Sequence, residues 1–170
     1  METGARGGTW SSLRRFLVMF LFAVWFGGFS FYSVVVVPTG HRVLRSKVRQ
    51  GFITQQVTNK LNLLGVVTVA ALAWQVVAMR HAKSRRWFRV AAISWTALAV
   101  TLAVLFWLHP QLDALLDPVA RSVADDDKFY TLHRWYLIVA TVQWLAMMVH
   151  AGALLTETHR IPDAQAGGPE

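Results

Sequence analysis

Residues 16–38 form the uncharged run FLVMFLFAVWFGGFSFYSVVVVP, which is 23 residues long. About 20 apolar residues in a helix cross the ~30 Å hydrocarbon layer of a bilayer, so this run predicts a transmembrane helix. Arg14 and Arg15 precede it, as basic residues also precede the apolar region of a signal peptide. A signal peptide has only about 7–15 apolar residues and ends in a small-residue cleavage site. The length of the run and its end at Val34–Pro38 therefore favour a retained first span.

Three further stretches share this character: Leu61–Met79, Val90–Leu108 and Trp135–Thr156. The expected fold class is therefore all-α, an integral membrane four-helix bundle.

The boundaries of the predicted segments follow from where charged residues stop and start. Residues 1–12 and 157–170 are polar and predict a flexible N-terminus and a disordered tail. Between them we predict a transmembrane domain over 13–156, with spans at about 16–38, 61–79, 88–109 and 133–156.

The connection between the first two spans, residues 41–60, mixes polar and apolar positions. Its first half is basic, and its second half is rich in Gln, Thr and Asn. Apolar residues are interleaved along its whole length. This pattern predicts an amphipathic connection, either a helix in the headgroup region or an extension of one of the spans.

Composition agrees with a membrane protein and excludes several kinds of chemistry. Of the 170 residues, 55% are hydrophobic and 15% charged, against about 25% charged in soluble domains. The absence of cysteine excludes disulfides, iron–sulfur clusters and thiolate catalysis. The net charge of +8 comes from basic residues that flank the apolar runs. Anionic lipid headgroups, and not nucleic acid, are therefore the expected partners of these residues.

The distribution of basic residues predicts the orientation. With four spans, the N-terminus, the 80–89 loop and the C-terminus share one side, which carries nine Lys and Arg residues against eight on the other. The 80–89 loop is a compact basic cluster, and such clusters favour the cytoplasmic side. We therefore predict a multi-pass protein of the cell membrane with both termini in the cytoplasm.

The fourth run contains a polar stripe. Tyr136, Gln143 and His150 recur at intervals of seven, and Met147 lies on the same side. Seven residues are nearly two helical turns, with a drift of only about 20° per heptad, so these side chains share one face. Polar groups facing lipid are costly, and we expect the stripe to face the bundle interior. It serves either as interhelical hydrogen bonding that fixes register or as a path for a ligand, proton or cofactor.

His150 is the ionisable member of the stripe, about six residues and about 9 Å inside the run. An imidazole at this depth is a hypothesis for haem ligation or proton transfer. Haem also needs a second axial ligand, and Met79 is the residue expected near the same level. A b-type haem or quinone-linked redox protein is therefore the alternative function.

A second group of candidates comes from topology. His41 follows the first span, His109 ends the third and His133 begins the fourth, so all three lie near one membrane face. Acidic residues 125–127 precede the fourth span, so they are expected near the same membrane face as the histidines. Imidazoles and carboxylates are ligands for copper or zinc, so these residues form a candidate metal site. The alternative is that they are solvated or hydrogen-bonded surface histidines.

Catalytic signatures are missing from the sequence. It has no glycine-rich phosphate loop and no HExxH motif, and no Asp or Glu lies inside the four runs. An enzyme is therefore not favoured, and a proton-coupled transporter lacks its usual membrane carboxylate. The leading function is a non-enzymatic membrane component that handles a small ligand or a metal, or an accessory subunit of a membrane complex. Its partners would be the lipid bilayer and other membrane subunits or further copies.

Three short stretches carry a resemblance to known proteins. They are Gly27–Tyr32 with Val35–Pro38, Gly51–Thr54 with Val57–Asn62, and Phe129-x-x-Leu132-His133. With these motifs the chain resembles small uncharacterised bacterial four-helix membrane proteins, over about residues 16–155. That group is distantly similar to copper-resistance D-like membrane domains. The copper analogy implies a role for His41, His109 and His133, although no Met- or His-rich ligand run accompanies them.

Overall fold

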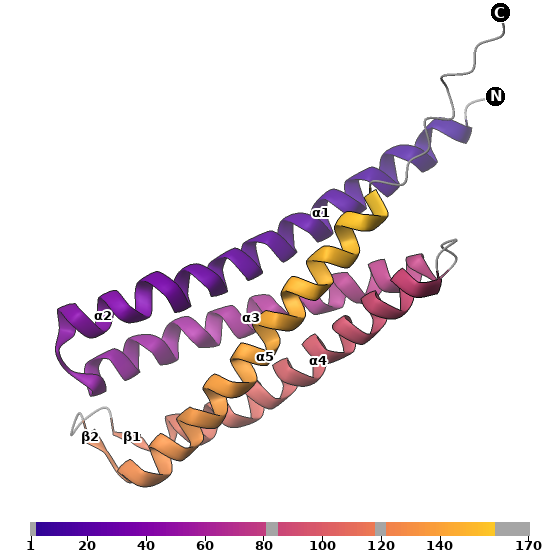
Figure 1. Ribbon diagram of the computed structural model, residues 1–170. Coiled ribbons are helices and arrows are strands. Elements are labelled where there is room, and N and C mark those ends of the chain that lie inside the picture. The colour runs from indigo at the N-terminus through magenta and orange to yellow at the C-terminus, as the bar shows by residue number, and fades with distance from the viewer. Residues whose placement is uncertain (1–2, 81–84, 118–121, 159–170) are drawn as a thin grey trace, which may run out of the picture.

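A computed structural model describes residues 3–80, 85–117 and 122–158, and nearly all of them are helical (Figure 1). Within these residues, four helical segments are long and apolar enough to cross a membrane. The predicted all-α, four-helix membrane bundle is confirmed. The segments are Ser12–Leu44, Val48–Met79, Arg85–Asp113 and Asp126–Thr156.

The first rod consists of α1 (Thr3–Phe31), one π-helical turn η1 (Tyr32–Val36) and α2 (Val37–Leu44). Pro38 explains the wide turn, because proline has no N–H and its ring clashes with the carbonyl four residues earlier in an α-helix. The N–H of Val37 instead donates to the Tyr32 carbonyl, five residues back. The helix therefore continues past Pro38, where the sequence predicted the end of the first span.

The N-terminal segment is helical. Residues 3–12, predicted to be flexible, form the first turns of α1. Once a helix is nucleated, each added residue gains a hydrogen bond without a new nucleation cost, so the apolar span carries the helix outward. The predicted disordered tail lies almost wholly in residues 159–170, outside the described part of the chain.

The second rod, α3 (Lys47–Met79), begins directly after α2 ends. Arg45 adopts a left-handed conformation with φ 47° and reverses the chain. Ser46 then caps α3, and its hydroxyl accepts a hydrogen bond from the Arg49 N–H at 3.4 Å. The amphipathic connection 41–60 is thus divided between helical extensions of both spans. With 33 residues, α3 is about 50 Å long and extends well beyond the hydrocarbon layer.

The remaining rods are α4 (Arg85–Asp113) and α5 (Asp126–Thr158). A two-stranded antiparallel ribbon joins them, with β1 (Leu116–Asp117) paired to β2 (Ser122–Val123). Pro110 does not end α4, which continues to Asp113. At the start of α5, the Asp125 carboxylate accepts a hydrogen bond from the Lys128 N–H at 3.0 Å.

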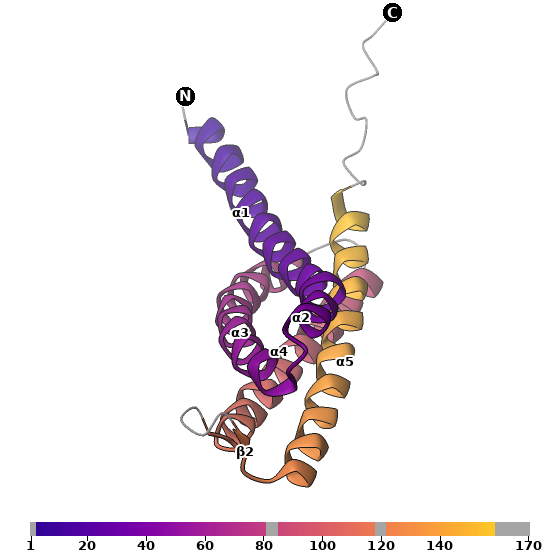
Figure 2. The same ribbon diagram turned by 90° about the vertical axis from the view of Figure 1, so that its left-hand side faces the viewer.

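The rods pack in an up-and-down order, α1 on α3, α3 on α4 and α4 on α5, with α1 also touching α5. The α4–α5 contact is the most extensive. α1 begins and α5 ends at one end of the bundle, whereas the α2–α3 turn and the β-ribbon lie at the other (Figures 1 and 2). The core contains several side chains with no exposed surface: Trp25, Leu72, Leu98, Leu105 and Met147. Many outward side chains are large and apolar, as a lipid environment requires.

Candidate ligand-binding cavity

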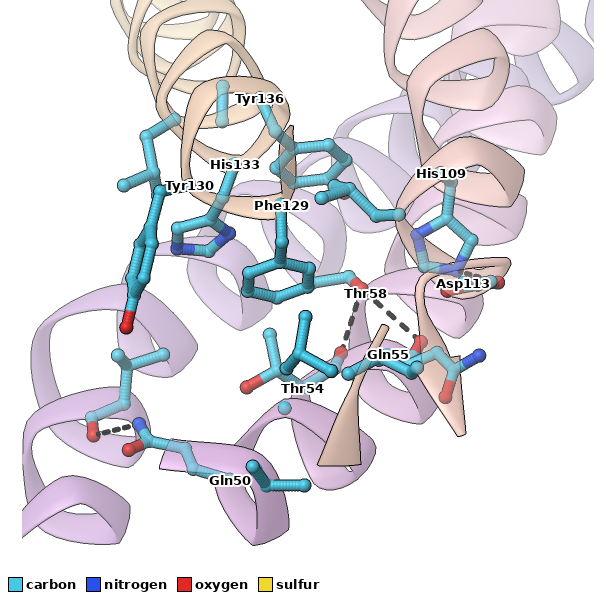
Figure 3. Close-up of a pocket in the computed structure, with 18 of the residues that line it drawn as sticks. Gln50, Thr54, Gln55, Thr58, His109, Asp113, Phe129, Tyr130, His133 and Tyr136 are labelled. Carbon is cyan, nitrogen blue, oxygen red and sulfur yellow. Dashed lines mark hydrogen bonds and ion pairs between the residues drawn. The ribbon is translucent and has the colours of Figure 1, made fainter. Parts of the chain in front are cut away.

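A cavity of about 520 Å³ lies at the end of the bundle that carries the α2–α3 turn and the β-ribbon (Figure 3). Every helical rod and both strands contribute to its wall. Aromatic and aliphatic side chains make up most of the lining. Examples are Phe29 and Tyr32 on the first rod, Leu112 on α4, and Phe129 and Tyr136 on α5.

All three histidines of the predicted metal site line this cavity. They come from α2, α4 and α5, which meet at this end of the bundle. Each has a local partner. His41 Nδ1 shares a hydrogen bond with Gln50 Oε1 at 3.2 Å, and His109 Nε2 lies 3.5 Å from Asp113 Oδ2. His133 stacks on Phe129 at 5.8 Å between ring centroids.

The metal hypothesis gains no support from this arrangement. Among the described residues, no group of three His, Asp or Glu side chains could hold a metal ion. The imidazoles of His41, His109 and His133 line different parts of the wall, where each meets a protein partner. Histidines that lie near the same membrane face therefore need not bring their imidazoles together around one metal ion.

Hydrogen bonds fix the polar part of the wall. The Asn62 amide donates to the Tyr136 hydroxyl at 3.3 Å, which joins α3 to α5. The Gln50 amide donates to the Val37 carbonyl at 2.8 Å, which joins α3 to α2. Tyr32 is only 8% exposed. Its hydroxyl has no atom of the described chain at good hydrogen-bond geometry, although Thr54 lies near it. Tyr32 therefore adds a buried hydroxyl to this wall, beside Thr54.

The predicted polar stripe of α5 does face the interior. Tyr136 is 8% exposed, and Gln143, Met147 and His150 are fully buried. Only Tyr136 reaches the cavity. His150 Nδ1 shares a 2.8 Å hydrogen bond with the Ser94 hydroxyl on α4. Within the described residues, neither amide atom of Gln143 has a hydrogen-bond partner.

The residues of the haem hypothesis lie deeper in the bundle. His150 is held by Ser94 on α4 and by the Phe22 ring on α1, at 5.9 Å between ring centroids. Met79 packs in an apolar cluster with Ala91 and Ala153. His150 and Met147 are therefore part of the interhelical packing, and within the described chain Tyr136 and His150 each make a hydrogen bond to another helix.

Sequence reasoning missed several residues of the cavity wall, including Tyr32, Thr54, Asp113 and Phe129. One signal was available, because Asp113 follows His109 by four residues and this spacing places both side chains on one helix face. Tyr32 lies within the apolar first run, where no sequence pattern distinguished it as a cavity residue.

Comparison with known proteins identifies a family to which the sequence is similar. The model of a domain of unknown function, DUF4149, matches residues 20–117, more than half of the chain. The chain belongs to the DUF4149 family. The matched range holds the cavity residues of α1, η1, α2, α3, α4 and β1, including Tyr32, His109 and Asp113. Neither the curated proteins nor the solved structures gave a match. The resemblance to four-helix membrane proteins thus has a family behind it, whereas the similarity to copper-resistance D-like domains is not confirmed.

Proposed function

We propose that this DUF4149 protein is a non-enzymatic component of the cell membrane that binds a small amphipathic molecule. The observation that carries the proposal is the cavity. Its volume of about 520 Å³ falls within the roughly 300–1,000 Å³ typical of ligand sites. Its mainly apolar wall with a few fixed polar groups is also typical of such sites.

The depth of the cavity favours an amphipathic ligand. Phe29 and Ala140 lie within the uncharged runs, whereas Gln50 and Asp126 lie outside them. The cavity therefore crosses the border between hydrocarbon and headgroups. A molecule with an apolar body and a polar head would match both zones.

The hydrogen bonds of the hydroxyl groups in the cavity wall favour a binding role over a catalytic one. The Thr58 hydroxyl donates to the Thr54 carbonyl at 2.7 Å, and the Tyr136 hydroxyl accepts from Asn62. A hydroxyl nucleophile would instead need to bond to a general base such as histidine. The His109–Asp113 pair is therefore interpreted as part of the binding wall.

Native mass spectrometry of the protein released from lipid nanodiscs tests the proposal. We expect a bound molecule of defined mass on the wild-type protein. Gly51→Phe should displace it, because Gly51 lines the cavity and an added Cβ meets only Leu116 at 3.8 Å, which is ordinary contact. Gly152→Phe is the matched control, since among described residues nothing lies within 4 Å of a Cβ there.

The result that would overturn the proposal is a wild-type protein without such a molecule, or a Gly51→Phe variant that retains it. An empty cavity together with a co-purifying protein in fixed ratio would instead favour the role of accessory subunit.

A further inference from the structure

We infer that the ligand of this cavity is an organic cation with an apolar body, such as a substituted ammonium or phosphonium ion. The inference rests on the proposed function and adds the sign of the ligand's charge. It follows from the charges of the lining residues, the position of Asp113 and the aromatic faces of the wall.

Among the described residues of the cavity wall, aspartates outnumber lysines and arginines, although the chain as a whole is basic. The full chain carries +8, yet the described residues that line the cavity include Asp113 and Asp126 and neither lysine nor arginine. Basic residues of the nearby α2–α3 turn, such as Arg42 and Arg45, are exposed and lie outside the lining. Those residues suit the phosphates of lipid headgroups. The wall itself therefore favours a cation over an anion.

Asp113 is the main candidate for attracting a cation because of its position in α4. It is the last residue of α4. The C-terminal end of a helix has a negative partial charge, so a carboxylate there is unfavourable for the helix itself. Asp126 is different, since it lies in the first turn of α5 and stabilises that helix end. At Asp113, the carboxylate and the helix dipole both attract positive charge to the same part of the wall.

The local environment of Asp113 is only partly open to water. Its side chain is 31% exposed, and that of its neighbour His109 is 12% exposed. His109 Nε2 lies 3.5 Å from Asp113 Oδ2, and the described lining places no lysine or arginine beside this carboxylate. Figure 3 shows this pair on α4 at the side of the cavity, with Phe129 between it and His133. A cation would thus meet the carboxylate in a medium less polar than bulk water, where attraction is stronger.

The aromatic side chains supply the second part of the recognition. Five of them line the cavity and come from two sides of it: Phe29, Tyr32, Phe129, Tyr130 and Tyr136. The face of an aromatic ring attracts a cation, with each contact worth about 0.5–2 kcal/mol. The buried Tyr32 hydroxyl, which lies near Thr54, adds a polar group to the same wall.

Tetraphenylphosphonium and tetraphenylborate are suitable probes, because they have nearly the same shape and opposite charge. Their binding is measured by equilibrium dialysis against the protein in nanodiscs of zwitterionic lipid, with protein-free discs subtracted. We expect saturable binding of the phosphonium ion and binding of the borate ion that is weaker by about tenfold or more.

Variants of the carboxylates locate the effect. Asp113→Asn should weaken phosphonium binding by about tenfold or more, the lower limit for losing a charged partner. Asp113→Glu keeps the charge and should keep most of the binding. Asp127→Asn is the matched control, because Asp127 is exposed on α5 and does not line the cavity. If Asp113→Asn fails to fold, the preference of the wild-type protein between the two ions still decides the matter.

The outcomes separate this inference from the proposed function. Equal binding of the two ions, or tighter binding of the borate ion, overturns the cation inference and leaves a ligand-binding cavity. Loss of binding in Asp127→Asn but not in Asp113→Asn also overturns it. If neither ion binds and the native mass spectrum of the wild-type protein shows an empty cavity, both the inference and the proposed function fail.

Discussion

Gly65 on α3 tests how the first rod is held in the bundle. A Cβ added at Gly65 would lie 2.8 Å from Cε2 and from Cζ2 of the Trp25 indole on α1. Carbon atoms in contact prefer about 3.5–4.0 Å, so the ring or the helix would have to retreat by about 0.7 Å. Trp25 has no exposed surface, and its ring therefore has no free space into which to move.

The expected magnitude is a balance of two opposing effects. Overpacking a filled interior costs about 1–3 kcal/mol, whereas alanine gains up to about 1 kcal/mol over glycine in a helix. Gly65→Ala should therefore lower the free energy of unfolding by up to about 2 kcal/mol. Gly27→Ala on α1 is the matched control, since no described atom lies within 4 Å of a Cβ there. It should be neutral or slightly stabilising.

The measurement is unfolding in mixed detergent micelles by increasing sodium dodecyl sulfate, followed by circular dichroism. A second substitution, Trp25→Phe, removes ring atoms that meet the new Cβ. The double variant should therefore lose less stability than the sum of the two single variants, because the residues are in contact. If Gly65→Ala is as stable as Gly27→Ala, or if the effects of the two substitutions simply add, the packing of Trp25 on Gly65 is refuted.

Three further predictions test the interior, the cavity wall and the orientation. Ser94→Ala removes the hydrogen-bond partner of buried His150 and should lower the free energy of unfolding by about 1–3 kcal/mol in the same titration; an unchanged value would contradict the packed role of the stripe. Tyr136→Phe leaves the buried Asn62 amide without its acceptor and should cost about 1–2 kcal/mol, and a more stable variant would argue against that bond. Because the chain has no cysteine, Ser122→Cys places one thiol on exposed β2. A membrane-impermeant maleimide should label it in intact cells if both termini are cytoplasmic, whereas labelling only after lysis would reverse the orientation.

The membrane architecture could be predicted because it depends on the chemistry of single segments. An uncharged run such as 16–38 has few alternatives to a spanning helix, and successive spans must alternate in direction across the bilayer. The inward face of Gln143 and His150 could also be predicted, since burial of polar groups away from lipid is a local rule of helix periodicity.

Helix ends were less predictable, for reasons visible at two prolines. Pro38 is accommodated by a π-helical turn, and Pro110 lies within the last turn of α4. In both cases the chain continues the helix, because one missing hydrogen bond costs less than ending a rod that packs against its neighbours. The polar residues of 47–60 likewise continue α3, since Ser46 caps it and the segment contains no proline.

The cavity could not be predicted from sequence, because its wall is assembled from residues far apart in the chain. Tyr32 and Tyr136 are separated by most of the protein, and only packing brings both into one wall. The three histidines show the limit of topological reasoning. It placed His41, His109 and His133 at one end of the bundle, but it could not reveal that each one has its own partner on the wall.

Contacts between polar residues of α4 and α5 fix the positions of the side chains on this side of the cavity wall. Antiparallel packing that joins Ser94 to His150, and brings the rings of His109 and Tyr136 to 6.3 Å, fixes a single register between the two helices. A slip of one turn would expose these polar groups to apolar surroundings at a cost of several kcal/mol each, in a medium that offers no water. The contacts deep in the bundle therefore determine where His109 and Tyr136 stand at the cavity. The interior stripe and the cavity are thus two parts of one arrangement, in which buried contacts position residues that line the cavity.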